Sequence, residues 1–121
     1  LAMEQQDATT SLLCSTLPRL SRLVKETGVE ACMDIPLVLE HGTDVDAYYQ
    51  AFGQLAHVHF SDTDGAALGQ GDIDLDGILA RLDAHGYAGK IGLALWGAVH
   101  YPDPDSPLRV CRDWLLARKE K

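Results

Sequence analysis

The stretch Ala56-His57-Val58-His59-Phe60-Ser61-Asp62 decides how this chain is interpreted. Its two histidines are spaced i, i+2 in an apolar run, which places both imidazoles on the same face of a β-strand. Asp62 lies directly after this strand, at the start of a loop that contains glycine. Parallel α/β proteins keep their chemistry at strand ends of this kind, where imidazole and carboxylate occur together. The alternative interpretation is a buried structural pair of histidines.

The flanking sequence alternates between predicted strands and predicted helices. Short apolar runs predict strands at Leu1–Glu4, Val29–Ile35, Leu55–Ser61 and Ile91–Trp96. Helical spacing of apolar residues predicts helices from Ser11 or Ser15 to about Thr27, and at Asp44–Phe52, Leu75–His85 and Pro107–Lys119. A regular β-α alternation predicts a parallel sheet with right-handed crossovers.

Two architectures share this pattern: an open doubly wound sheet, and half of an eight-stranded barrel. No glycine-rich phosphate-binding fingerprint follows any predicted strand. The segment Gly69-Gln70-Gly71-Asp72 is too short for GxGxxG and does not directly follow a strand. This weakens the nucleotide-binding alternative.

Composition narrows the class of protein. The 121 residues include 18 acidic and 10 basic side chains, so the formal net charge is -8. This balance disfavours binding to nucleic acid or to anionic membrane surfaces, and no apolar run approaches the ~20 residues of a membrane span. The three cysteines, Cys14, Cys32 and Cys111, have no metal-finger spacing, which favours a reduced, cytoplasmic setting. We interpret Cys32 and Cys111 as small apolar core residues.

Acidic and imidazole side chains lie at or near three predicted strand ends: Glu4, Asp34 and His59. The carboxyl ends of parallel strands curved around one axis converge on one face. Two carboxylates and one imidazole are suitable ligands for a divalent Mn, Mg, Co or Zn ion, and they leave positions open for substrate oxygens. Glu4, Asp34 and His59 are therefore candidate ligands of a divalent metal; the alternative for Glu4 is a structural or solvated loop acid.

Three further residues are predicted to contact substrate: His57, Asp62 and Trp96. His57 shares the strand face of His59 and could instead support it through a hydrogen bond. Trp96 is either a core residue or a wall of the pocket, since indole faces stack on sugar rings.

Six segments form a recognisable pattern: Cys32-Met33-Asp34-Ile35-Pro36, His57-Val58-His59-Phe60-Ser61-Asp62-Thr63-Asp64-Gly65, Leu68-Gly69-Gln70-Gly71-Asp72-Ile73-Asp74, Gly86-Tyr87-Ala88-Gly89, Trp96-Gly97 and His100-Tyr101-Pro102-Asp103-Pro104. Together they resemble the sugar phosphate isomerase/epimerase family of xylose isomerase-like barrels. The resemblance is closest to the fructoselysine and ketose 3-epimerase branch, and it covers essentially the whole chain. It corresponds to the C-terminal half of that barrel, strands five to eight.

The resemblance implies a metal-dependent activity on a sugar or sugar phosphate, in which a proton moves at the carbon next to a ketose carbonyl. By this resemblance Glu4, Asp34 and His59 are three of four metal ligands, and Glu4 is also one of two acid/base carboxylates. The family's fourth ligand, a glutamate and the second acid/base, falls at Ala94. Loss of one such carboxylate costs about 10²–10⁴ in rate.

We expect residues 1–121 to form a single α/β domain, the C-terminal half of a (β/α)₈ barrel. A full barrel needs about 250 residues, so we expect a fragment, a homo-oligomer or a pairing with another half-barrel. Two rival functions stay open. One is a non-catalytic sugar- or protein-binding relative, which Ala94 motivates. The other is an endonuclease-like phosphodiesterase or a dehydratase on the same barrel.

Overall fold

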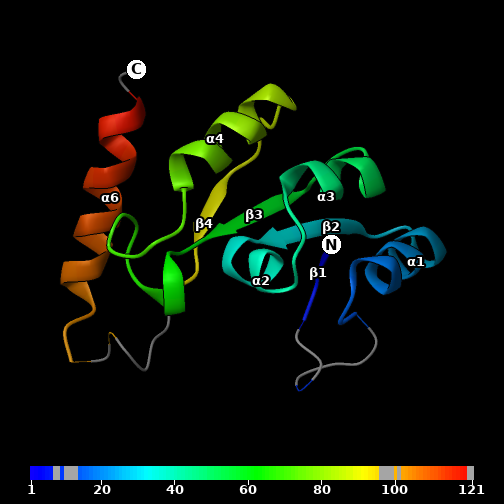
Figure 1. Cartoon of the computed structure of the whole chain (residues 1–121), viewed down its shortest axis with the longest axis horizontal. Coiled ribbons are helices and arrows are strands. Elements are labelled where there is room, and N and C mark those ends of the chain that lie inside the picture. The colour runs from blue at the N-terminus through cyan, green and yellow to red at the C-terminus, as the bar shows by residue number, and fades with distance from the viewer. Residues whose placement is uncertain (7–8, 10–13, 96–99, 101, 120–121) are drawn as a thin grey trace.

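The computed structural model describes residues 1–6, 9, 14–95, 100 and 102–119. Four parallel strands form one sheet in the order β1-β2-β3-β4, which is also their order along the chain (Figure 1). The strands are β1 (Ala2–Glu4), β2 (Glu30–Asp34), β3 (His57–Phe60) and β4 (Ile91–Leu93). Sequential parallel strands joined by helices are the arrangement of a βα barrel segment, which confirms the predicted fold class.

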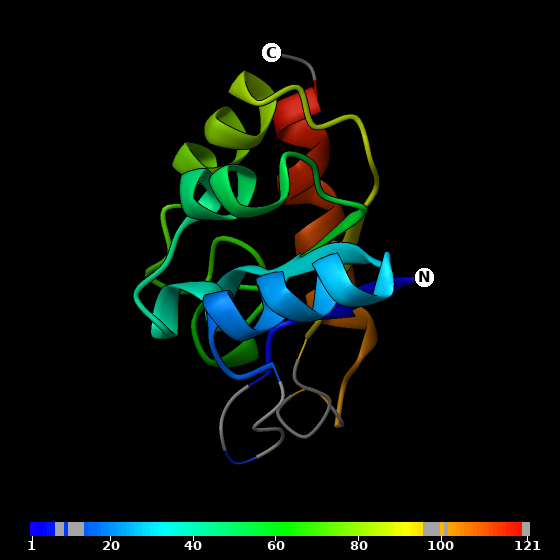
Figure 2. The ribbon, with the colours of Figure 1, turned by 90° about the vertical axis from the view of Figure 1, so that its right-hand side faces the viewer.

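Helices separate the strands and follow one another along the sheet. They are α1 (Leu17–Thr27), α2 (Ile35–Glu40), α3 (Val45–Phe52), α4 (Leu75–Ala84) and α6 (Asp105–Lys119), with a 3₁₀ turn, η1 (Thr63–Gly65), after β3. Helix α3 packs between α1 and α4, and Figure 2 shows α3 and α4 stacked next to one another. Arg118 of α6 pairs with Asp76 of α4. This succession is that of the outer helical layer of a barrel.

The hydrophobic core lies between the sheet and these helices. Every second strand residue points into it, and the side chains of Ala31, Met33, Val58 and Phe60 are buried. They pack with apolar residues of the helices, including Leu20, Val38, Tyr48, Ile78 and Leu82. The intervening residues of each strand point to the opposite face. Glu4, Cys32, Asp34, His57 and His59 therefore share the inner face of the sheet.

The helix after β2 is an element that the sequence pattern did not predict. The sequence predicted a strand over Val29–Ile35 and the next helix at Asp44–Phe52, but the strand ends at Asp34 and α2 begins at Ile35. The Asp34 carboxylate accepts a hydrogen bond from the Leu37 amide at 3.1 Å, and Pro36 occupies the first turn. An aspartate N-cap followed by proline is a helix start, but six residues are too few to show helical periodicity.

The other predicted elements are present with shifted ends. Helix α1 begins after Thr16, which supports the later of the two predicted starts, and Pro18 lies in its first turn. The strand expected at Leu55–Ser61 is limited to His57–Phe60, and the one expected at Ile91–Trp96 ends at Leu93. Trp96 lies outside the described residues. Shifts of one or two residues at element ends are usual; the end of β4 lies three residues before the predicted one.

Candidate active site on the inner face of the sheet

An acid–imidazole pair lies at the centre of the inner face. Glu4 ends β1 and His59 lies in β3, and β2 runs between them. The two side chains meet across β2, with the Glu4 Oε2 atom 2.7 Å from His59 Nδ1. The other carboxylate oxygen of Glu4 accepts a hydrogen bond from Gln6 Nε2 at 2.9 Å. The predicted proximity of Glu4 and His59 is therefore present in the structure.

Cys32 lies directly beneath this pair, in the strand that separates the two partners. Its Sγ atom is 4.0 Å from Glu4 Oε2 and 3.8 Å from His59 Nδ1. Burial, with the nearby carboxylates of Glu4 and Asp34, raises the pKa of the Cys32 thiol to about 12. Cys32 is buried, as predicted for a core residue, but its thiol also lies next to Glu4 and His59 on the inner face. Its position two residues before Asp34 was the available signal, because i and i+2 residues share a strand face.

Asp34 is adjacent to this cluster but is oriented differently. It is the register partner of His59, and its Oδ1 atom caps helix α2 through the Leu37 amide. The pKa of the Asp34 carboxyl is raised above its ordinary value, mainly because the group is buried. The hydrogen bond from the Leu37 amide acts in the opposite direction, and the negative charge of Glu4 adds to the rise. The donor atoms that lie within 4.8 Å of one another belong to Glu4, Cys32 and His59. A metal-binding role for Asp34 stays a prediction.

His57 packs against His59 on the same face. The two rings meet edge to face, with centroids 4.9 Å apart and planes inclined by 81°. Gly92 of β4 lies opposite them, and a Cβ atom there would come 2.7 Å from His57 Nε2 and 3.1 Å from His59 Cδ2. Glycine at this position therefore leaves the space that both imidazoles occupy.

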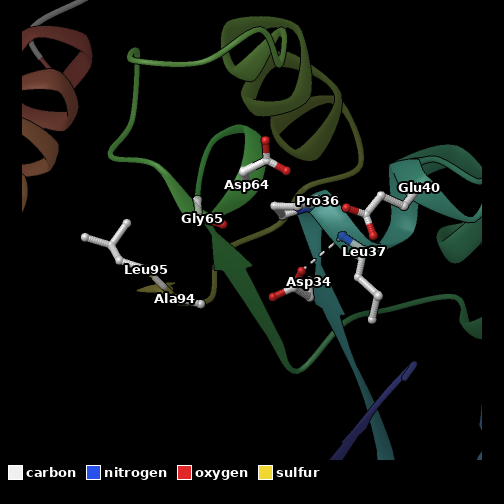
Figure 3. Close-up of a pocket in the computed structure, with 9 residues that line it drawn as sticks. Asp34, Pro36, Leu37, Glu40, Asp64, Gly65, Ala94 and Leu95 are labelled. Carbon is white, nitrogen blue, oxygen red and sulfur yellow. Dashed lines mark hydrogen bonds between the residues drawn. The ribbon is translucent and has the colours of Figure 1, made fainter. Parts of the chain in front are cut away.

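A pocket of about 420 Å³ opens beyond the carboxyl ends of β2, β3 and β4. Figure 3 shows Asp34 at the end of β2 and Ala94 just after β4, on either side of β3, with Asp64 above them and Glu40 on the side of α2. Three carboxylates, those of Asp34, Glu40 and Asp64, contribute to the wall, and no basic side chain does among the described residues. The volume lies in the range of small-molecule sites.

Ala94 lines this pocket at the position where the resemblance places the fourth metal ligand. Its amide donates to the Phe60 carbonyl at 2.9 Å, so the chain continues alongside β3 beyond the end of β4. The pocket wall has a methyl group at this position. Trp96, predicted to contact substrate, cannot be placed because it lies outside the described residues.

Asp62 organises the loop after β3. Its side chain is fully buried, and its carboxylate accepts hydrogen bonds from the amides of Thr63 (2.8 Å), Gly69 (3.0 Å) and Ile73 (3.1 Å). Burial opposes ionisation, but these backbone donors outweigh it and lower the pKa of Asp62. These contacts shape the loop above the pocket, and the substrate-binding role of Asp62 stays a prediction.

The fold and this inner face define a class of protein: a parallel βα barrel segment with acidic and imidazole groups at its strand ends. The model of the xylose isomerase-like TIM-barrel family matches residues 1–117, and the chain belongs to this family. No curated protein sequence matches the chain.

Solved structures of sugar epimerases share the fold. The chain is 22% identical to 3-keto-D-glucoside 4-epimerase from E. coli, with a TM-score of 0.68, covering 89% of this chain and 44% of that one. It is 21% identical to D-psicose 3-epimerase from Clostridium cellulolyticum H10, with a TM-score of 0.68 and coverage of 78% and 34%. For D-allulose 3-epimerase from Methylomonas sp. the identity is 17%, the TM-score 0.68 and the coverage 78% and 35%. The chain thus spans less than half the length of each of these proteins.

Within the described residues, no helix has the length and apolar character that crossing a membrane requires. No disulfide joins the three cysteines, all of which are buried.

Proposed function

We propose that this chain provides the metal-binding and proton-transfer face of a sugar isomerase or epimerase that acts at the carbon next to a ketose carbonyl. The observation that carries the proposal is the Glu4–His59 pair, 2.7 Å apart on the inner face of a parallel sheet. The family membership and the fold shared with sugar epimerases support it.

The donor chemistry of the inner face fits a divalent cation. A carboxylate and an imidazole nitrogen already lie within hydrogen-bond distance, and a thiol lies within 4.0 Å of both. These are ligand types that Zn, Co and related ions accept. Glu4 and His59 would hold the ion, which when bound would polarise the carbonyl group of the sugar.

Glu4 is the proton carrier in this proposal. Its carboxylate is fixed by Gln6 through one oxygen and by His59 through the other, so its position relative to the strand ends is defined. A carboxylate held in this way can take a proton from the substrate carbon and return it to the same face. His57 and His59, packed edge to face, limit how far the imidazole that faces Glu4 can turn.

The pocket favours a neutral polyhydroxylated ligand over a phosphorylated one. Its described wall offers the carboxylates of Asp34, Glu40 and Asp64, which accept hydrogen bonds from hydroxyl groups. A phosphate group would be repelled by these carboxylates and would meet no basic side chain among the described wall residues. We therefore propose an unphosphorylated ketose as the substrate class.

Ala94 determines which step this chain performs. Epimerisation needs a second acid/base group on the opposite face of the substrate carbon, and the pocket wall has a methyl group where the resemblance places that carboxylate. We expect Glu4 alone to exchange the proton next to the carbonyl with solvent and to leave the configuration unchanged.

Proton NMR in heavy water tests this proposal directly. A ketose incubated with the chain and Mn²⁺, Co²⁺ or Zn²⁺ should lose the signal of the hydrogen next to the carbonyl without forming the epimer. Glu4→Gln should abolish the exchange. Ala94→Glu should convert exchange into epimerisation, with a gain of about 10²–10⁴ in rate for the added acid/base group.

A non-catalytic sugar-binding relative is the second candidate, and Ala94 in the pocket wall is the observation that favours it. Saturation-transfer NMR separates the two functions. Saturation transfer to a ketose without any exchange, in both the unmodified chain and Ala94→Glu, would support binding alone and contradict the catalytic proposal.

A further inference from the structure

Gln5, the residue directly after Glu4, has a polar side chain that is buried in the core. It is 1% exposed. Its Oε1 atom accepts a hydrogen bond from the Tyr48 hydroxyl at 2.7 Å, and its Nε2 atom donates to the Ser15 carbonyl at 3.2 Å. A buried amide group without such partners is costly, so these two hydrogen bonds favour one orientation of the Gln5 side chain.

Gln5 and Glu4 point to different sides of the sheet. Glu4 ends β1 and its carboxylate meets His59 on the inner face, whereas the Gln5 side chain is buried against Tyr48 of α3. Successive side chains alternate in this way along an extended chain. A rotation of the backbone at this point would move both side chains together. The buried orientation of Gln5 therefore constrains the orientation of Glu4.

Tyr48 holds Gln5 from the outer helical layer. It lies in α3, is fully buried, and packs edge to face with Phe52 at a centroid distance of 5.5 Å. Burial, together with the nearby carboxylate of Glu4, raises the pKa of the Tyr48 hydroxyl. The hydroxyl therefore keeps its proton at neutral pH and donates it to Gln5. The two partners are 43 residues apart, so the bond joins the end of β1 to a later βα unit.

Strand β1 by itself places few constraints on Glu4. It has three residues and, within the described part of the chain, pairs with β2 alone. Two contacts of Gln6 hold the chain that follows: its amide donates to the Cys14 carbonyl at 3.0 Å, and its side chain donates to Glu4 at 2.9 Å. The hydrogen bond between Gln5 and Tyr48 connects this part of the chain to the core.

We propose that Gln5 and Tyr48 are positioning residues, whose buried hydrogen bond holds the end of β1 so that the Glu4 carboxylate faces His59. Neither residue belongs to the wall of the pocket, so both act through Glu4. The catalytic consequence rests on the proposed function, in which Glu4 carries the proton. A misplacement of about 1 Å, caused by a change far from the reacting atoms, can cost about 10²-fold in rate.

Two variants remove the hydrogen bond. Tyr48→Phe removes the donor, and Gln5→Met/Tyr48→Phe removes both partners while nearly keeping their shapes. Replacement of both partners by apolar groups can leave stability nearly unchanged, so the double variant separates positioning from folding. Circular dichroism and thermal melting check that each variant folds. Tyr49→Phe is the matched control, because Tyr49 is the next residue of the same helix and stacks on His85.

Nitrogen-15 NMR of the histidines in the metal-free chain reports the orientation of Glu4 without any activity. A carboxylate oxygen 2.7 Å from His59 Nδ1 gives this nitrogen a resonance that differs from that of an unbonded imidazole. The resonance is identified by its absence in His59→Ala. We expect it to move toward the unbonded position in Tyr48→Phe and in the double variant, and to stay in place in Tyr49→Phe.

Proton exchange on a ketose in heavy water, with Co²⁺ present, gives the catalytic readout. Tyr48→Phe and the double variant should lower kcat by up to about 10²-fold and should leave KM nearly unchanged, because the pocket wall is intact. Tyr49→Phe should keep both constants. This separation of kcat from KM is expected of a misplaced proton carrier and not of a general loss of stability.

The outcomes distinguish this inference from the proposed function. An unmoved His59 resonance in the folded double variant would overturn the inference and leave the bond between Gln5 and Tyr48 as a structural contact. Absence of exchange in the unmodified chain would contradict the proposed function, while the resonance would still decide whether Tyr48 positions Glu4. A moved resonance with an unchanged kcat would support the positioning and contradict Glu4 as the proton carrier.

Discussion

Replacement of Asp62 by alanine should destabilise the protein more than any other single substitution in the loops near the pocket. The Asp62 carboxylate is fully buried and accepts three backbone hydrogen bonds, from Thr63, Gly69 and Ile73. Hydrogen bonds to a charged group are worth about 1.5–3 kcal/mol each, so three of them give at least about 4.5 kcal/mol. The Gly69 amide belongs to an exposed residue and can be rehydrated, which reduces the expected loss to about 3 kcal/mol.

Urea denaturation followed by circular dichroism measures this loss. For a chain of this length, about 3 kcal/mol corresponds to a fall of the melting temperature by about 10 °C. Asp64→Asn is the matched control, because Asp64 is exposed in the same loop and its φ of 56° is a conformation that asparagine adopts readily. The control should change the free energy of unfolding by less than about 0.5 kcal/mol. An Asp62→Ala loss below about 1 kcal/mol would refute the assigned role of these hydrogen bonds.

The same residue predicts a pH dependence with a definite sign. The pKa of Asp62 is lowered in the folded protein from its ordinary value of 3.8. Its stabilising contribution is therefore complete above pH 3.8 and decreases as the pH falls through the lower folded-state pKa. The stability difference between the unmodified chain and Asp62→Ala should be constant near neutral pH and should shrink below pH 3.8. A difference that stays constant down to pH 2 would contradict this assignment.

Three further predictions concern the inner face and its supports. Tyr48→Phe removes the hydroxyl that donates to Gln5 Oε1 at 2.7 Å and leaves this buried acceptor unpaired. The free energy of unfolding, measured by thermal denaturation, should fall by about 1–3 kcal/mol. An unchanged melting temperature would show that water replaces the hydroxyl. Gly92→Ala should displace the His57 ring, because its Cβ would come 2.7 Å from His57 Nε2. In a double-mutant cycle with His57→Ala we expect a coupling of at least about 0.5 kcal/mol, and strict additivity would exclude the contact. Zn²⁺ at 100 times its Kd should raise the free energy of unfolding by about 2.7 kcal/mol, and His59→Ala should remove this increase; an equal increase in that variant would place the ion elsewhere.

The sequence by itself determined the order of strands and helices and the parallel sheet. The reason is that apolar periodicity and capping residues are local signals: Gly28 ends α1, and Asp44 and Asp74 cap α3 and α4. It also placed Glu4 and His59 on one face, because residues that alternate along parallel strands converge at the carboxyl ends. Among the described residues, α2 and the 3₁₀ turn η1 were missed, since elements of six and three residues are too short for helical periodicity to be visible.

The tertiary structure decided which side chains meet. Cys32 and Asp34 both face inward from β2, and the sequence favoured the carboxylate as a ligand. The register places Cys32 level with Glu4 and with His57, while the Asp34 carboxylate caps the helix that follows it. Asp62 likewise belongs to a sequence motif near a strand end. Its carboxylate, however, accepts hydrogen bonds from backbone amides as far away as Ile73, eleven residues along the chain. Such long-range partners depend on strand register and loop closure, which a local sequence pattern does not contain.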